Sequence, residues 1–81
     1  MTEAFVFVNC FLAMAGAVES VAKITEGVSG SYATTGIYDL VLKVSVPDES
    51  KLKDVINRIK HIPGVASMMT SIVLKPSTRD R

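Results

Sequence analysis

Hydrophobic positions along the chain follow two different spacings. Residues 40–46 alternate, and every even-numbered position in this segment is aliphatic, which is typical of a strand with one buried face. Farther along, aliphatic residues recur every three or four positions and predict one apolar helix stripe: Leu52, Val55, Ile56, Ile59 and Ile62. Asp48 precedes that stripe as an N-cap, and Pro63 followed by Gly64 ends it.

Three further segments complete the predicted elements. Residues 5–8 are β-branched or aromatic throughout and predict a strand that is apolar on both faces. A less regular apolar stripe predicts a first helix from about Ala15 to Thr25. Residues 68–74 predict the last strand, with its even-numbered side chains on one face and its odd-numbered side chains on the other.

A weak internal repeat relates the two halves of the chain. The segment 23–28 aligns with 60–65 in its first lysine and in its final Gly-Val pair. Each half then runs strand, helix, Gly-Val turn, strand. Two such halves in 81 residues predict an α+β domain of the ferredoxin-like βαββαβ type, with a four-stranded antiparallel sheet and two helices on one face.

The apolar content of the chain predicts self-association. A domain of this length buries only about 60% of the surface that its unfolded chain exposes. Cys10 is the only cysteine and His61 the only histidine, so we expect neither an internal disulfide nor a metal site. The second sheet face carries Val41 and one side of the first strand, and a second copy would cover it. We therefore predict a dimer closed sheet to sheet.

Charge and hydropathy limit the partners and the compartment. Nine basic residues face eight acidic ones, without the basic stripe expected of a nucleic-acid binder. The apolar run 4–18 is too short for a membrane-spanning helix, and the leader before it is acidic rather than basic. We expect a cytoplasmic protein with one domain over residues 1–75 and a flexible basic tail over residues 76–81.

Catalytic chemistry finds no support in the sequence, whereas one turn suggests binding. Cys10 lies in an apolar strand without a nearby cation, and neither a paired-carboxylate site nor a glycine-rich phosphate loop occurs. We expect no catalytic residue and no cofactor. In the turn before the third strand, Asp39 can bind an ammonium group, and backbone N–H groups near Gly36 can bind a carboxylate. A plain turn with a solvated aspartate remains the alternative.

Four short motifs resemble one known family in order and separation: residues 35–40 (TGIYDL), 46–48 (VPD), 62–65 (IPGV) and 70–74 (TSIVL). Together they resemble the C-terminal effector domain of the Lrp/AsnC (feast/famine) transcriptional regulators, also called the regulation of amino acid metabolism domain. The resemblance implies the βαββαβ fold and sheet-to-sheet dimers that assemble into tetramers, octamers or decamers. It also implies an amino acid effector bound between neighbouring dimers.

The resemblance also implies the residues that contact the effector. Gly36 and Asp39 match the family's effector-contacting turn, with Thr35 and Tyr38 beside them, and the last strand supplies the other wall: Met69, Thr70, Ser71 and Ile72.

The chain starts at the first strand of that domain, so it resembles a stand-alone form without the helix-turn-helix. Such a form would regulate transcription without binding DNA itself, through full-length Lrp/AsnC regulators. The alternative is a small dimeric α+β barrel enzyme, a cofactor-free monooxygenase or isomerase. Its catalytic candidates would be Tyr32, Tyr38 and Asp39 inside a sheet-lined cavity.

Overall fold

The computed structural model describes residues 1–74, and their order of elements is the predicted βαββαβ. The elements are β1 (Thr2–Cys10), α1 (Ala15–Ala22), β2 (Val28–Ala33), β3 (Leu40–Val46), α2 (Glu49–Lys60) and β4 (Val65–Val73). The predicted basic tail over residues 76–81 lies outside the described residues.

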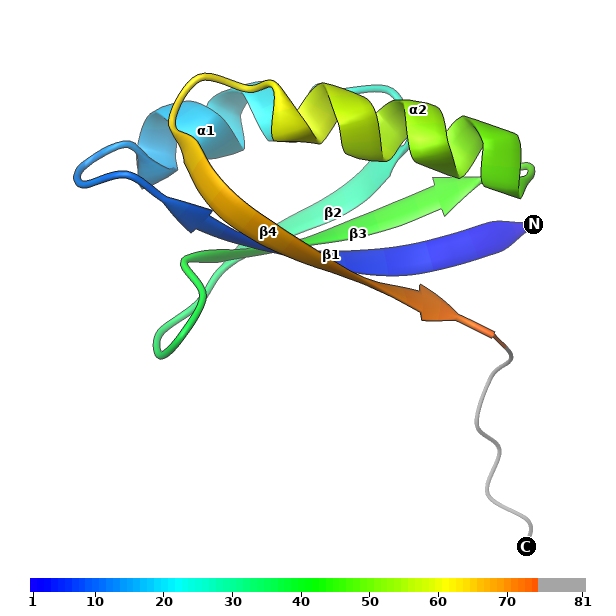
Figure 1. The fold of residues 1–81 in the computed structure, drawn as a ribbon, viewed down its shortest axis with the longest axis horizontal. Helices are drawn as coiled ribbons and strands as arrows, with labels where there is room; N and C mark the ends of the chain where they lie inside the picture. Colours follow the sequence, from blue (N-terminus) through cyan, green and yellow to red (C-terminus); the bar gives the residue numbers. More distant parts are fainter. Residues whose placement is uncertain (75–81) are drawn as a thin grey trace, which may run out of the picture.

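The four strands form one antiparallel sheet in the order β2-β3-β1-β4, and both helices lie on the same face of it (Figure 1). In the register, Phe7 of β1 stands opposite Val41 of β3 and Met69 of β4. Because directly opposed residues of antiparallel strands point to the same side, this register decides which side chains share each face. The ferredoxin-like prediction is confirmed.

The core fills the space between the sheet and the helices. The even-numbered side chains of β3 are at most 4% exposed, as the alternation in the sequence predicted. They meet Val6 and Val8 of β1 and the apolar side of each helix, which includes Val18 of α1 and Ile59 of α2. None of the buried side chains among residues 1–74 is polar or charged. Apolar burial therefore holds the two helices on the sheet.

Local signals explain where the helices begin and end. The Asp48 carboxylate accepts a hydrogen bond from the Lys51 backbone N–H at 3.0 Å, so the predicted N-cap of α2 is confirmed. The first helix ends at Ala22, three residues before the predicted Thr25, because the chain tightens there. The Thr25 N–H donates to the Ala22 carbonyl, three residues back, in a tighter turn than an α-helix makes.

The opposite face of the sheet is partly apolar and carries no helix. It presents aromatic, aliphatic and sulfur-containing side chains from all four strands: Phe5, Phe7, Tyr32, Val41 and Met69. We call these five residues the open-face cluster. Tyr32 is 57% exposed and Met69 is 47% exposed, whereas Val6 of β1 and Leu42 of β3, on the helix side, are buried.

Candidate functional site

The predicted effector turn is an ordered loop between β2 and β3. The Thr34 hydroxyl donates to the Tyr38 carbonyl at 2.6 Å, and the Thr34 N–H donates to the Asp39 carbonyl at 3.0 Å. These bonds close the loop across its base. Gly36 at the tip has φ +106°, a conformation that other residues rarely adopt. Thr35 and Gly36 are both exposed, so the tip presents its backbone to the surroundings.

Asp39 joins this loop to the end of β1. Its N–H donates to the Val8 carbonyl at 3.0 Å, and its Oδ2 accepts the Cys10 N–H at 2.7 Å. The carboxylate thus takes the place of a backbone acceptor where the β1–β3 pairing stops. Among residues 1–74, Oδ1 has no hydrogen-bond donor. A half-buried carboxylate held in this way can accept a further donor, such as an ammonium group.

The Cys10 thiol is affected by the same arrangement. Partial burial raises the pKa of this thiol above its ordinary value, and the nearby Asp39 carboxylate raises it further. Cys10 packs against the core, in agreement with the prediction of a packed rather than a reactive cysteine.

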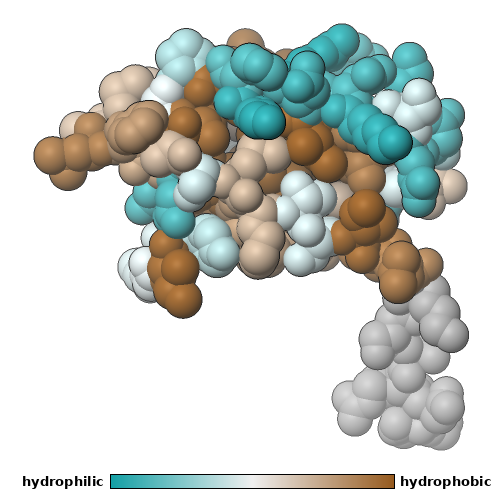
Figure 2. Space-filling model, viewed as in Figure 1, coloured by the Kyte–Doolittle hydropathy of each residue, from teal (hydrophilic) through white to brown (hydrophobic). Residues whose placement is uncertain are grey.

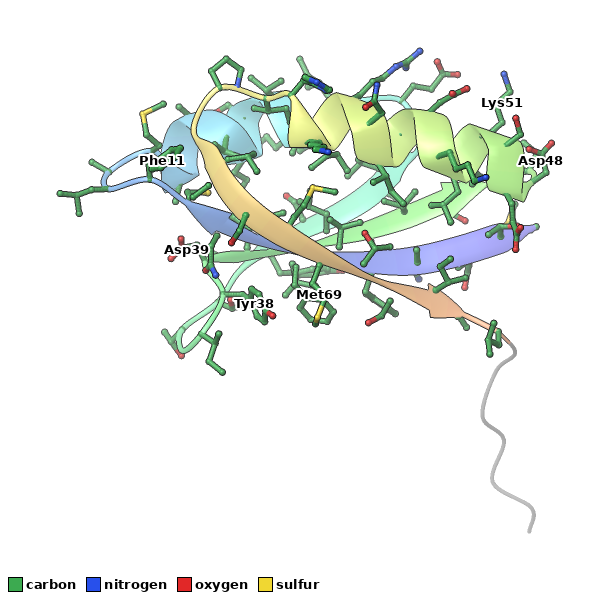
Figure 3. All side chains as sticks on the ribbon, viewed as in Figure 1. Phe11, Tyr38, Asp39, Asp48, Lys51 and Met69 are labelled. Atoms are coloured by element: carbon green, nitrogen blue, oxygen red, sulfur yellow. The ribbon has the colours of Figure 1, made fainter. Side chains whose placement is uncertain are left out.

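Tyr38 links the loop to the last strand. Its ring lies 5.4 Å from the ring of Phe7, measured between centroids, at an interplanar angle of 46°. The Tyr38 hydroxyl donates to the Met69 sulfur at 3.7 Å. Figure 3 shows Tyr38 and Met69 next to each other on the side of the sheet away from the helices. The structure therefore brings together one predicted residue from each wall of the site.

The remaining predicted residues of β4 divide between the two faces of the sheet. Ser71 stands opposite Phe5 on the same face as Met69, whereas Thr70 stands opposite Val6 and points toward the helix side. Ile72 follows Thr70 on that side and is 44% exposed, because β4 is an edge strand. The period of two makes this division unavoidable, so one subunit does not gather all four β4 residues around Asp39.

A second apolar loop lies near Asp39 and was not predicted as part of the site. This loop follows β1, and it lies near Asp39 because the N–H of Cys10, the last residue of β1, donates a hydrogen bond to the Asp39 carboxylate. Phe11 and Leu12 in this loop are 61% and 96% exposed. Phe11 is labelled at this end of the molecule in Figure 3, and Figure 2 shows a hydrophobic projection there. Ile37, in the loop between β2 and β3, is 81% exposed as well. Phe11 and Leu12 lie within the apolar run 4–18, where nothing in the sequence distinguishes them from buried residues.

The tyrosine candidates of the alternative barrel enzyme do not lie between the sheet and the helices of one subunit. Tyr32 points to the open face, opposite Val41, and not into the space between sheet and helices, which the core fills. Residues 1–74 contain no group of His, Cys, Asp and Glu side chains suited to a metal ion. They also contain no helix long and apolar enough to cross a membrane.

The fold is that of a small ferredoxin-like domain of the α+β type. The sequence pattern of the Lrp/AsnC ligand binding domain matches residues 3–81, and the chain belongs to this family. The family resemblance drawn from the four motifs is thereby confirmed.

Curated relatives match part of the chain, among them a transcriptional regulator and an enzyme. The HTH-type transcriptional regulator FL11 of Pyrococcus horikoshii is 43% identical over 44 residues, which cover 54% of this chain and 29% of that regulator. The homocitrate synthase of Sulfolobus acidocaldarius is 38% identical over 50 residues, which cover 62% of this chain and 11% of the enzyme. The match therefore spans about a tenth of the synthase and less than a third of the regulator.

Solved structures match over almost the whole chain. TTHA0845 from Thermus thermophilus has a TM-score of 0.91 at 29% identity, over 98% of this chain and 100% of that one. AsnC from E. coli has a TM-score of 0.86 at 26% identity, over 99% of this chain and 55% of AsnC. The chain thus corresponds to the whole of TTHA0845 and to about half of AsnC.

Proposed function

We propose that this chain is a non-enzymatic module that binds an amino acid effector and regulates transcription of amino acid metabolism by assembling with other subunits. The observation that carries the proposal is the Asp39 carboxylate, held through Oδ2 by Cys10 and open at Oδ1, beside the exposed turn at Gly36. The carboxylate would bind the ammonium group of the amino acid. Backbone N–H groups of the turn would bind its carboxylate.

The surroundings of Asp39 favour an amino acid with an uncharged, apolar side chain. The residues beside Asp39 are uncharged: Cys10, whose N–H donates to the carboxylate, and Tyr38, which contacts Phe7 and Met69. A charged effector side chain would need an opposite charge here, and burying it without one is unfavourable. A methionine complex is named for a transcriptional regulator from Neisseria meningitidis that shares this fold at 23% identity and a TM-score of 0.80.

Assembly would proceed in two steps from the two exposed apolar surfaces. The open-face cluster would pair with the same face of a second copy, forming the sheet-to-sheet dimer. Phe11 and Leu12, in the loop after β1, and Ile37, in the loop before β3, are exposed and would contact a neighbouring dimer, giving a tetramer, octamer or decamer. The effector site would then be completed where dimers meet, with β4 residues from more than one subunit.

The regulatory output would come from partners and not from this domain alone. Residues 1–74 hold two helices, and both pack on the sheet, so no helix-turn-helix is formed within that part of the chain. Full-length Lrp/AsnC regulators are the partners that the fold suits best. Mixed assembly would let this subunit carry the effector signal to a DNA-bound protein in the cytoplasm.

Thermal unfolding with each of the twenty amino acids tests the proposal, together with the mass of the assembly in solution. One apolar amino acid should raise the melting temperature in proportion to the logarithm of its concentration, and should change the assembly size. If no amino acid shifts either quantity at saturating concentration, the proposed function is wrong.

Two variants of Asp39 separate its structural role from its charge. Asp39→Asn keeps an oxygen that can accept the Cys10 N–H but loses the charge, and should abolish the effector-dependent shift. Asp39→Ala should abolish the shift and also lower the melting temperature without effector. Glu49→Ala, which removes an exposed carboxylate from the first turn of α2, is the matched control and should keep the effector-dependent shift.

A further inference from the structure

A groove at the far end of β3 from Asp39 has the features of a second ligand site. It encloses about 230 Å³ and is lined by the turn before β2, the end of β3 and one side of α2. Asp39 precedes β3 and Val46 ends it, so the two sites lie more than about 20 Å apart along the strand. Figure 3 shows Asp39 and Lys51, which lines the groove, at opposite ends of the molecule.

The floor of the groove is apolar and tightly built. Val46 and Val55 are 4% and 5% exposed. Gly27 approaches α2 so closely that a Cβ atom on it would lie 2.6 Å from a methyl group of Val55, and it has φ +99°. The Gly27 carbonyl accepts the Ser45 N–H at 2.8 Å, which fixes the turn on the end of β3. The groove is therefore a built feature and not a gap beside a loose loop.

The rim of the groove carries both signs of charge. Lys51, Asp54 and Arg58 line it from α2, and Glu26 lines it from the turn. None of these four side chains makes a hydrogen bond to another side chain or to the backbone within residues 1–74. The backbone N–H of Lys51 already donates to Asp48, so Lys51 would meet a ligand through its side chain.

This combination matches a small zwitterion. We propose that the groove binds a free α-amino acid, whose carboxylate pairs with Arg58 and Lys51 and whose ammonium group pairs with Glu26 and Asp54. The side chain of the amino acid would rest on Val46 and Val55. The volume is below the roughly 300–1,000 Å³ of sites for drug-sized ligands, which fits a ligand of this size. The groove lies on the helix side of the sheet, so a sheet-to-sheet dimer leaves it open.

Backbone amide chemical shifts, followed as each L-amino acid is titrated into the full chain, test this site. An amino acid that binds the groove should move the amides of Gly27, Ser45 and Val55 along one binding curve. The amides of Gly36 and Asp39 report on the effector site separately. If every amino acid leaves the groove amides unmoved up to millimolar concentration, the groove proposal is wrong whatever the Gly36 and Asp39 amides do. Shifts confined to Gly36 and Asp39 would support only the effector site.

Three variants test whether the rim charges are the cause. Arg58→Gln and Lys51→Gln should each weaken groove binding by about tenfold, the usual loss for one charge-assisted hydrogen bond. Lys53→Gln removes an exposed lysine of the same helix that does not line the groove, and should leave the groove affinity unchanged. Equal affinities for wild type, Arg58→Gln and Lys51→Gln would overturn the proposal, as would an equal loss in Lys53→Gln.

The effector-site variant gives the final separation. In the Asp39→Asn variant, the amide chemical shifts of Gly27, Ser45 and Val55 should still change with amino acid concentration, and the fitted affinity should equal that of wild type. The reason is that the two sites share no residue. Loss of the groove shifts in this variant would mean that they were transmitted from the effector site, and the second site would then be rejected.

Discussion

Both faces of the sheet carry apolar side chains, but only one face is covered by helices within the subunit. On the helix side Val6 and Leu42 are completely buried within one subunit. On the other side Phe5 is 36% exposed, and Met69 is 47% exposed. The fold of a single chain thus buries the apolar side chains of the helix-covered face, whereas it leaves part of the open-face cluster exposed to solvent. The first face therefore sets the stability of the subunit, and the second is available for association.

The largest expected effect comes from opening a cavity on the helix-covered face. Leu42→Ala should lower the free energy of unfolding by about 3 kcal/mol, because a fully buried leucine loses its contacts and leaves a void. Val41→Ala, one residue away on the open face, should lower it by about 1 kcal/mol in the monomer. Urea unfolding of both variants at low protein concentration measures the two values. Equal losses would show that the faces do not differ as described.

The next effect concerns association. Val41→Asp places a charge between Phe7 and Tyr32, where no opposite charge stands directly across in the register. A sheet-to-sheet dimer would bury this charge twice, so dimerisation should weaken by about a hundredfold or more. Light scattering after size-exclusion chromatography measures the mass.

Lys53→Asp is the control for this charge change, since Lys53 is exposed on α2. It should keep the dimer mass, and circular dichroism should show that both variants remain folded. A dimer that persists in Val41→Asp would move the interface away from the open face.

Much of this two-faced arrangement could be predicted from the sequence, because it depends on local periodicity. The alternation over residues 40–46 predicted the buried side of β3, and Asp48 predicted the start of α2. The end of α1 was less predictable, since the stop comes from backbone turns at Thr25 and not from a proline or glycine.

The contacts that build the candidate site could not be predicted, because they join distant residues. The bond from Cys10 to Asp39 depends on the register of β1 against β3, and the contact of Tyr38 with Met69 depends on β4 as well. The motifs pointed to Asp39 and Gly36. They did not show that one oxygen of the Asp39 carboxylate accepts the Cys10 N–H while the other has no donor among residues 1–74. Exposure of Phe11 and Leu12 is equally non-local, since their apolar character alone is that of a core residue.

A smaller effect on the free energy of unfolding is expected at the end of β1, where Asp39 contacts Cys10. Asp39→Ala removes the acceptor of the Cys10 N–H and should lower the free energy of unfolding by about 1–2 kcal/mol without effector. Asp39→Asn keeps an acceptor oxygen and should lose less. Thermal unfolding of the two variants beside wild type measures the difference. An equal loss in both variants would mean that the charge, and not the acceptor, holds this end of the sheet.

The smallest expected effect is a pH dependence of stability that comes from the thiol of Cys10, at the end of β1. Burial and, to a lesser degree, the Asp39 charge raise the pKa of the thiol above 9.0 in the folded protein. Because the folded pKa is above the unfolded value, this contribution to stability is complete below pH 9.0 and declines as the pH rises through the folded pKa.

Alkylation by iodoacetamide across alkaline pH measures the pKa, because the thiolate is the species that reacts. The folded protein should reach its half-maximal rate at a higher pH than the protein unfolded in urea. Asp39→Asn should lower this midpoint only in part, because burial is the larger cause and remains. A folded midpoint at or below the unfolded one would contradict a thiol packed against the core. It would place Cys10 instead with the exposed residues of the loop that follows, among Phe11 and Leu12.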